Sequence, residues 1–327
     1  MTPPSSTVDR RPGDPGSALP EAVSRRVRST DGTLLAVREW GPDGAPTVVL
    51  VHGYPDTSEL WHGVVERLAA DHHVVAYDVR GAGASDRPRG VRGYRLEQLS
   101  RDLAAVLDAT TDPGERIHLV GHDWGAIQSW ESAASPTVAP RLASFTAVAG
   151  PSLDLTGHWV RHRLRLDGRA ARQNARQLLH SWYIVAFHLP LLAPLAWRLG
   201  IGRSWARVFA RSEGVAPPAG HPAPTITRDG IDGIGLYRAN MLSRVLRPRY
   251  ERVEVPLVQI GITLRDNFIS PDLYEDLPDL VPELWVRRAD APHWMPVLDP
   301  GTVARWVREA VAAVEQGAPR PADAAAR

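Results

Sequence analysis

The most constraining feature of this sequence is the stretch LVGHDWGAIQ at residues 119–128. Gly121 and Gly125 flank Asp123 with the spacing of a nucleophile elbow, a sharp turn between a strand and a helix that presents its central side chain above a sheet. The preceding run IHLV is typical of a buried strand, and the following run AIQSWESAA is compatible with a helix. An ordinary turn in which Asp123 caps the helix is equally compatible with this stretch alone. The rest of the chain must therefore decide between a nucleophile and a cap.

The remainder of the chain alternates short β-rich runs with helical patterns, which is typical of an α/β fold with a mostly parallel sheet flanked by helices. The expected strands are Leu34–Trp40, Thr47–Val51, Val74–Tyr77, Ile117–Val120, Ser144–Val148, Leu257–Ile262 and Leu284–Arg287. The expected helices are Ser58–Ala70, Leu96–Asp108 and Thr302–Val314. Residues 152–249 show no strand pattern, so they are expected to form an all-α cap inserted after Ser144–Val148, which is counted as the sixth strand of the complete sheet. The core then consists of residues 25–151 and 250–316.

Composition limits the possible functions before the motifs are combined. The chain has 327 residues and a formal net charge of +1, so there is no overall electrostatic case for binding nucleic acid. It contains no Cys and no Lys, which excludes thiolate and Schiff-base chemistry and any cysteine metal site. The basic run at residues 161–176 is expected to be a solvated cap helix, with contact to anionic lipid as the alternative.

The two ends are predicted to be disordered tails, at residues 1–24 and 317–327, because both are rich in Pro, Ala, Gly or charge and lack an apolar signal region. The apolar run Ile184–Trp197 is interrupted by two prolines and is shorter than the ~20 residues of a membrane span, so no transmembrane segment is expected. It is instead expected to face an apolar ligand or to touch a bilayer surface. A cytoplasmic location is compatible with the absence of Cys.

Two loops after predicted strands bear on the site. In VLVHGYP the strand runs into residues 52–55, and the backbone N–H of Tyr54 can point to the space above the elbow. Together with the N–H of Trp124 it would form an oxyanion hole. The glycine-rich stretch YDVRGAGASD, residues 77–86, is not a dinucleotide fingerprint because its last position is Asp86 and no tight turn into a helix follows. It is therefore interpreted as a structural loop.

Two residues near the end of the chain, Asp266 and His293, follow Asp123 in the order of a catalytic triad. Asp266 follows one of the last strands in IGITLRDNF, and His293 follows the next in DAPHWMP. The order of nucleophile, acid and histidine is that of α/β-hydrolase triads. Asp154, just after strand Ser144–Val148, is a rival for the acid position. The remaining histidines show no array with metal-ligand spacing, so no metal is expected.

Taken together these motifs resemble the α/β-hydrolase fold, and specifically its epoxide hydrolase family, over roughly residues 25–316. The resemblance implies an Asp123 nucleophile with Asp266 and His293, and no cofactor. It also implies two cap tyrosines as acids, for which Tyr183 in SWYIVAFHLP and Tyr237 in GLYRANM match the family's segments. The residues expected to line the substrate site are His52, Pro55, Phe187 and Trp294. Pro292 departs from the Gly that is common before the family's histidine.

An acid at the elbow has a chemical reason. Attack of a carboxylate on an sp3 carbon leaves an ester, which water can cleave, whereas a serine would leave a stable ether. Asp123 is ionised at neutral pH because the reference pKa of Asp is about 3.9. His293, oriented by Asp266, is then free to activate the water that cleaves the ester. The tyrosines can donate a proton to the epoxide oxygen because a neutral phenol is the ordinary state at pH 7.

Two other functions remain open at this stage. A haloalkane dehalogenase would use the same nucleophile and histidine, but its halide usually finds a side-chain donor such as Asn after the HG pair, where this chain has Tyr54. A binding protein that has lost turnover would keep the fold. The favoured hypothesis is an epoxide hydrolase that acts on a small lipophilic epoxide. Detoxification is one biological role compatible with this activity, and a homodimer is one possible assembly. Product analysis separates these functions: a diol, a released halide, or stoichiometric capture.

Overall fold

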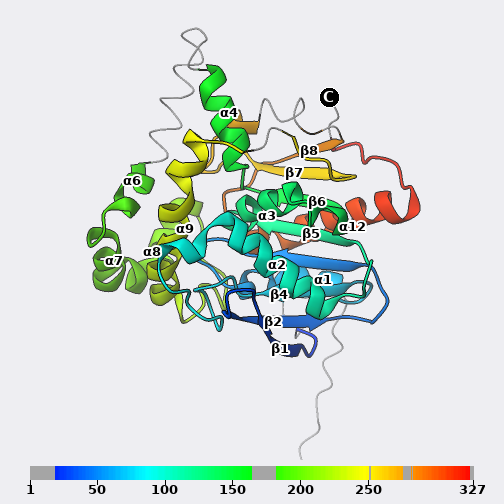
Figure 1. Cartoon of the computed structure of the whole chain (residues 1–327), viewed down its shortest axis with the longest axis horizontal. Coiled ribbons are helices and arrows are strands. Elements are labelled where there is room, and N and C mark those ends of the chain that lie inside the picture. Colours follow the sequence, from blue (N-terminus) through cyan, green and yellow to red (C-terminus); the bar gives the residue numbers. More distant parts are fainter. Residues whose placement is uncertain (1–18, 164–181, 250–251, 275–280, 282, 325–327) are drawn as a thin grey trace, which may run out of the picture.

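The computed structural model describes residues 19–163, 182–249, 252–274, 281 and 283–324, and its centre is an eight-stranded sheet (Figure 1). The strands lie in the order β1-β2-β4-β3-β5-β6-β7-β8. Their bounds are β1 Val23–Arg28, β2 Leu34–Trp40, β3 Thr47–Val51, β4 His73–Tyr77, β5 Ile117–His122, β6 Leu142–Val148, β7 Val258–Thr263 and β8 Leu284–Ala289. The pairs β1–β2 and β2–β4 are antiparallel and all others are parallel. Parallel order places the carboxyl ends of β3 to β8 at one edge, where ligands bind in open α/β sheets.

Helices cover both faces of the sheet, as the contacts of two successive side chains of β6 show. Phe145 packs against Trp130 of α3, while its neighbour Thr146 accepts a hydrogen bond from Gln259, which also donates to the carbonyl of Trp306 in α12. Successive strand side chains point to opposite faces, so α3 and α12 lie on opposite sides. The helix bounds in the core are α1 His62–Leu68, α2 Leu96–Thr110, α3 Trp124–Ala134, α11 Met295–Leu298 and α12 Pro300–Gln316. Short 3-10 turns are η1 Ser58–Trp61, η2 Val91–Tyr94, η3 Ala139–Arg141 and η6 Pro271–Tyr274.

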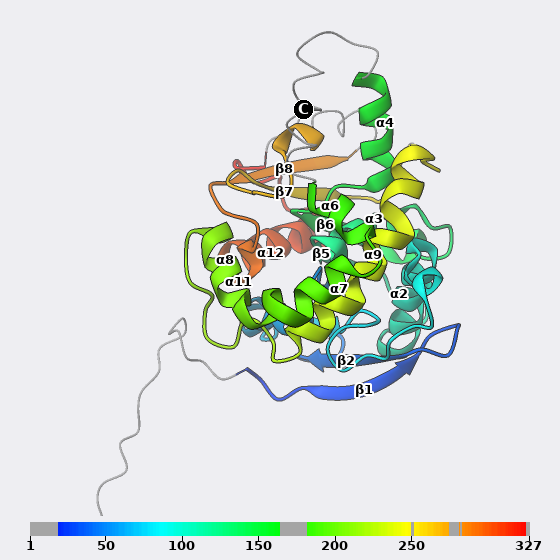
Figure 2. The ribbon, with the colours of Figure 1, turned by 90° about the vertical axis from the view of Figure 1, so that its left-hand side faces the viewer.

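Between β6 and β7 the described part of the chain is helical, as the sequence predicts, and these helices form a cap beside the carboxyl ends of the strands (Figure 2). Their bounds are α4 Leu153–Arg163, α6 Trp182–His188, α7 Leu192–Ala196, η4 Trp197–Ile201, η5 Gly202–Ser204, α8 Trp205–Glu213 and α9 Ile226–Leu246. Most of the basic run at residues 161–176 lies outside the described residues. The α/β-hydrolase architecture with an inserted helical cap is therefore confirmed.

The structure departs from the sequence prediction at both ends. Val23 and Ser24 belong to β1, so the sheet begins inside the segment expected to be a tail. At the other end most of the described residues 317–324 are exposed, but Asp323 pairs with Arg287 of β8 and with Arg305 of α12, and Ala324 is buried. The described part of the predicted tail after residue 316 therefore contacts the core at Asp323 and Ala324.

Candidate active site

Asp123 occupies the turn between β5 and α3 with φ 52° and ψ −123°, a left-handed conformation that is rare for a residue with a side chain. The backbone N–H of Asp123 donates to the carbonyl of Val148 at 3.1 Å, and the residue is 9% exposed. A Cβ at Gly125 would lie 2.0 Å from the carbonyl oxygen of Val51, so only glycine fits there. The strained turn presents Asp123 as a displayed group, with no side-chain cap bond to α3. The helix-cap alternative is therefore not supported.

The loop after β3 brings a donor to the nucleophile. The backbone N–H of Tyr54 donates to Oδ1 of Asp123 at 2.7 Å. A Cβ at Gly53 would lie 2.4 Å from the same oxygen, which explains the glycine before Tyr54. The N–H of Trp124, the first residue of α3, is adjacent in the chain. Of the two N–H groups predicted to form an oxyanion hole, that of Tyr54 is therefore directed at Oδ1 of Asp123.

His293 connects the predicted acid to the nucleophile. Its Nδ1 lies 2.8 Å from Oδ2 of Asp266, and its Nε2 lies 3.5 Å from Oδ2 of Asp123. Although burial opposes its charge, the carboxylates of Asp266 and Asp123 raise the pKa of His293 well above its ordinary value. Three residues, Asp123, Asp266 and His293, therefore form one charge-coupled group.

Asp266 is held as an anion by its surroundings. Its Oδ1 accepts the backbone N–H groups of Phe268 and Ile269 at 2.7 and 3.0 Å, and its Oδ2 accepts the hydroxyl of Thr263 at 2.9 Å. Burial alone would raise the pKa of Asp266, but His293 and these donors lower it below its ordinary value. The carboxylate is thus fixed in charge and in direction.

Both predicted cap tyrosines lie within electrostatic range of Asp123. Tyr183 of α6 and Tyr237 of α9 have ring centroids 5.9 Å apart, and Tyr237 also lies 4.8 Å from the ring of Trp124. Burial raises the pKa of each phenol, and the negative charge of Asp123 raises both further. Both tyrosines are therefore neutral at pH 7 and able to donate.

The predicted substrate-lining residues divide into two kinds. The Phe187 ring lies 4.8 Å from Tyr237 and 5.6 Å from Tyr54, within the aromatic wall of the site. His52 instead has a structural position, since Nε2 accepts the backbone N–H of Val79 and Nδ1 bonds the carbonyl of Gly53, both at 2.8 Å. Pro55 is buried beside it in the loop after β3. The structure thus supports Phe187 as a lining residue. Both ring nitrogens of His52 are instead hydrogen-bonded to the backbone, which gives this residue a structural role.

Trp294 is also held from several sides, by residues that sequence analysis missed. Its indole N–H donates to Asp56 at 2.7 Å, and its backbone N–H donates to Glu213 of α8 at 2.8 Å. Asp56 also bonds Nε2 of His221 at 2.8 Å. All these contacts join residues far apart in the chain, so no local pattern could reveal them. The network fixes the residue that follows His293 and links the cap to the core.

The rival acid, Asp154, is committed elsewhere. Its Oδ2 accepts Nη2 of Arg244 at 2.7 Å, and its Oδ1 accepts the backbone N–H of Arg249 at 2.7 Å. Arg244, which is buried, also pairs with Glu131 and Glu97 on the core helices. Asp154 is therefore part of an ion cluster that ties α9 of the cap to α2 and α3, and Asp266 is the acid that reaches His293.

The glycine-rich loop at residues 77–86 is filled by its own side chains. Asp78 accepts the backbone N–H groups of Ser58 and Ala84, both at 2.8 Å, and a Cβ at Gly83 would collide with its carboxylate. Arg80 pairs with Asp102 at 2.6 Å. These contacts support the interpretation of this stretch as a structural loop.

Comparison with known proteins agrees with this geometry. A family model described as alpha/beta hydrolase fold matches residues 46–300, so the chain belongs to that family. The chain is 36% identical over 297 residues to "Probable oxidoreductase EphD" of Mycobacterium tuberculosis, covering 88% of this chain and 49% of the relative. It is 28% identical to "Epoxide hydrolase" of Caballeronia sordidicola, with 87% and 89% covered. The solved structure of an epoxide hydrolase from Vigna radiata is similar with a TM-score of 0.70, at 21% identity, over 90% of this chain and 99% of that one.

These matches differ in what they cover. The chain spans about half the length of the EphD relatives. Its match to "Epoxide hydrolase A" of Mycobacterium tuberculosis, at 41% identity over 135 residues, covers 40% of each chain. The solved structure shares the fold. The reaction of this chain therefore has to be argued from its own site.

Proposed function

We propose that this protein is an epoxide hydrolase that converts a lipophilic epoxide to a vicinal diol through a covalent ester on Asp123. One observation carries the proposal. A displayed carboxylate has one oxygen on the N–H of Tyr54 and the other 3.5 Å from Nε2 of His293, with two neutral tyrosines within range of its charge. This arrangement supports the roles of Asp123 as nucleophile, His293 as the base that activates water, the Tyr54 N–H as oxyanion donor and the two tyrosines as proton donors.

The two oxygens of Asp123 have different roles in the first step. Oδ1 accepts the N–H of Tyr54, so we assign to Oδ2 the attack on an epoxide carbon. The new C–O bond forms as the ring C–O bond breaks, and its electron pair passes to the ring oxygen. That oxygen takes a proton from Tyr183 or Tyr237, which avoids a free alkoxide in a dry site.

Ester formation itself prepares the second step. Alkylation removes the negative charge of Asp123, one of the causes that hold the pKa of His293 high, so the histidine can release its proton to the tyrosinate. Neutral His293 then takes a proton from water, whose oxygen bonds to the carboxyl carbon of Asp123. Oδ1 carries the resulting negative charge at the N–H of Tyr54. Collapse of this intermediate breaks the bond between the carboxyl carbon and the diol oxygen, which takes the proton that His293 removed from water. The carboxylic acid of Asp123 then transfers its proton to His293, which restores the starting charges.

The wall of the site supports an apolar substrate. The rings of Tyr54, Phe187 and Tyr237 lie within 5.6 Å of one another in edge-on contacts. Two phenols favour an epoxide oxygen over a halide, and the position after the HG pair offers no side-chain donor, because the hydroxyl of Tyr54 donates to the carbonyl of Gly230. The relative named "Probable oxidoreductase EphD" is about twice as long as the part of it that matches this chain. In this chain, the loop at residues 77–86 is occupied by the carboxylate of Asp78, which gives no support for binding of a dinucleotide.

The test is a single turnover in water enriched in heavy oxygen, followed by mass analysis of the peptide that contains Asp123. Attack of water on the carboxyl carbon leaves one heavy oxygen in that carboxyl group. Label found only in the diol would contradict the ester mechanism. A panel of aliphatic, styrene-type and fatty-acid epoxides, with alkyl halides as the comparison, defines the substrate class.

A further inference from the structure

The outer side of the cap carries a dense set of exposed aliphatic side chains. Leu191 is 82% exposed, Val185 70% and Leu199 69%. We call the following set the apolar cap face: Val185, Leu189, Leu191, Leu192, Leu195 and Leu199. They lie on α6, α7 and η4 and on the turn between α6 and α7, within 15 consecutive residues. Contiguous exposed apolar surface on a folded protein marks an interaction site.

This face is the outer side of helices whose inner side forms the active site. On α6, Tyr183 and Phe187 contact the rings of Tyr237 and Tyr54, whereas Val185 points away from them into solvent. Beneath η4, Trp197 is buried and stacks on Trp205 with centroids 5.2 Å apart. The exposed side chains therefore stand on a packed base.

The chain segment that carries the apolar cap face and α8 has arginines but no acidic residue before Glu213. Arg203, Arg207 and Arg211 are exposed on η5 and α8, and none has an ion-pair partner among the described residues. Residues 182–212 contain no Asp or Glu. Glu213, the next acid in the chain, is buried and accepts the backbone N–H of Trp294. Exposed aliphatics flanked by unopposed arginines match the acyl boundary and the phosphates of an anionic bilayer.

The helices α6, α7 and α8 lie together on the side of the molecule that faces the viewer in Figure 2. Among the residues that the structure describes, none of the helices has the length and apolar character needed to cross a membrane. A second copy of the chain is a poorer occupant than a lipid surface. A two-fold contact through this face would bring its arginines near those of the partner, because such an interface uses the same surface on both copies.

We propose that the apolar cap face docks on the surface of a bilayer that contains anionic phospholipid. The aliphatic side chains enter the boundary between headgroups and acyl chains, and the arginines of η5 and α8 contact the phosphates. The docked cap lies one helix away from the nucleophile, because α6 has its exposed side on the lipid and its aromatic side on the site. A lipophilic substrate dissolved in the bilayer would then enter beside α6, a consequence that rests on the proposed function.

Binding to sucrose-loaded vesicles, measured by sedimentation, tests docking without using activity. We expect the full chain to bind vesicles of phosphatidylcholine with phosphatidylglycerol at least tenfold more tightly than phosphatidylcholine alone, with weaker binding at high salt. The double variant Leu191→Asn, Leu199→Asn should bind at least tenfold more weakly. The matched control is Leu242→Asn with Leu246→Asn. These leucines are exposed on the last turns of α9 and do not belong to the apolar cap face, so this variant should bind as the parent does.

A second variant keeps the test independent of the leucines. Arg207→Gln with Arg211→Gln removes charge from exposed positions of α8 and should reduce both the binding and its dependence on salt. Thermal unfolding of each variant checks that the fold is intact. Equal binding by the Leu191, Leu199 variant and the control would overturn the proposal. So would a concentration-dependent dimer, seen by light scattering, that only the Leu191, Leu199 variant abolishes.

Discussion

At the scale of single residues, the proposed reaction depends on how the charge of Asp123 controls the pKa of His293. Asp266 keeps its charge throughout, since burial is outweighed by His293 and by two backbone donors that lower its pKa. In the proposed mechanism, Asp123 is the carboxylate whose charge changes during turnover. We predict that Asp123→Asn, which removes this charge as alkylation does, lowers the pKa of His293.

The measurement is an NMR titration of the His293 ring carbon in the parent and in Asp123→Asn. In the parent, the midpoint should lie well above that of an ordinary histidine. In the variant it should move down, because Asp266 alone then stabilises the imidazolium. An unchanged midpoint would show that Asp123 does not control the base, and the proposed coupling of the two steps would fail.

The tyrosines give a second prediction at this scale. General acids contribute typically about 10²–10⁴ to a rate. Replacing Tyr183 or Tyr237 by Phe should slow ester formation by about tenfold or more, and replacing both should slow it by at least 10³, with little change in hydrolysis of an ester already formed. Rapid-quench mass analysis of the enzyme resolves the two steps. The control is Tyr94→Phe, a buried phenol on η2 outside the site; full-speed ring opening in the double cap variant would refute the assignment.

At the scale of elements, the loop that carries His293 is held by carboxylates from two other segments. Glu213 ends α8 and accepts the backbone N–H of Trp294, while Asp56 follows the loop after β3 and accepts its indole N–H. Removing one acceptor leaves a buried donor unpaired, at a cost of about 1–3 kcal/mol. Displacement of Trp294 would displace the imidazole next to it.

We therefore predict that Glu213→Ala slows hydrolysis of the ester more than its formation, so that the alkylated enzyme accumulates in intact-mass spectra during turnover. Glu213→Gln retains an oxygen acceptor for the Trp294 N–H and should restore most of the rate. Equal levels of alkylated enzyme in Glu213→Ala and in the parent would indicate that the contact between Glu213 and Trp294 contributes to stability only.

The sequence predicts those elements and residues that leave a local pattern, and it does not predict those that depend on contacts between distant parts of the chain. Buried strands such as Thr47–Val51 are continuous apolar runs, and β3 has those bounds. β1 was missed because VSRRVR is an edge strand with mostly exposed arginines, so its pairing with β2 leaves no apolar pattern. Asp123, Asp266 and His293 each follow a predicted strand, which is a local signal. The Trp294 network and the Arg244 cluster are made by tertiary contacts alone, so the sequence did not indicate Glu213 or the partner of Asp154.

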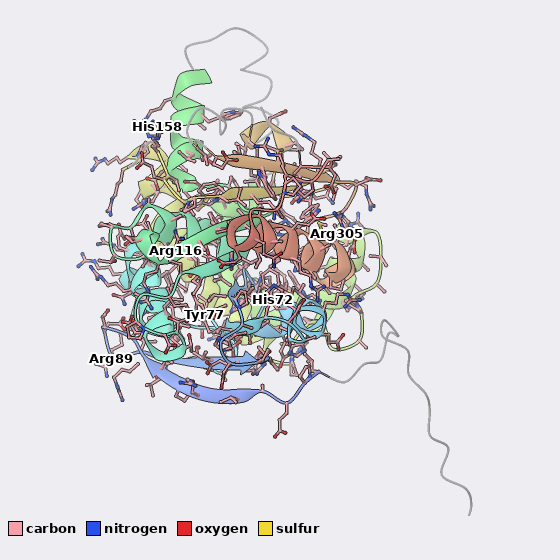
Figure 3. The ribbon with its side chains drawn as sticks, turned by 90° about the vertical axis from the view of Figure 1, so that its right-hand side faces the viewer. His72, Tyr77, Arg89, Arg116, His158 and Arg305 are labelled. Carbon is pink, nitrogen blue, oxygen red and sulfur yellow. The ribbon has the colours of Figure 1, made fainter. Side chains whose placement is uncertain are left out.

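At the scale of the whole molecule, two buried histidines link stability to pH. His122 in the elbow and His118 in β5 are both buried, and burial first, with neighbouring positive charge second, lowers the pKa of each to about 4. For His118 the added charges are those of His72 and Arg116, which Figure 3 labels on the side opposite the cap helices. The carboxylate of Glu315, 3.4 Å from its Nε2, is partly exposed and does not offset burial.

The sign of the effect follows from proton binding. In the unfolded chain each histidine titrates near 6.5, so between about pH 6.5 and pH 4 the unfolded state binds more protons, and the free energy of unfolding falls as the pH falls. His293 has the opposite shift, and the stability that it contributes is present below about pH 6.5 and lost as the pH rises through its folded pKa. On the acid side of neutrality, the buried neutral pair therefore dominates among these histidines.

We predict that the free energy of unfolding, measured by urea titration, decreases between pH 7 and pH 5 and that His118→Asn makes this decrease smaller by about 2 kcal/mol, the share of one histidine with these pKa values. Asn retains a polar partner for the hydroxyl of Ser144, which lies 2.8 Å from Nδ1 of His118. Because β5 places His118 at the end of the strand remote from Asp123, turnover at pH 7 should be unchanged. If the free energy of unfolding depends on pH as steeply in the variant as in the parent, burial of His118 within the sheet does not lower its pKa, and the prediction fails.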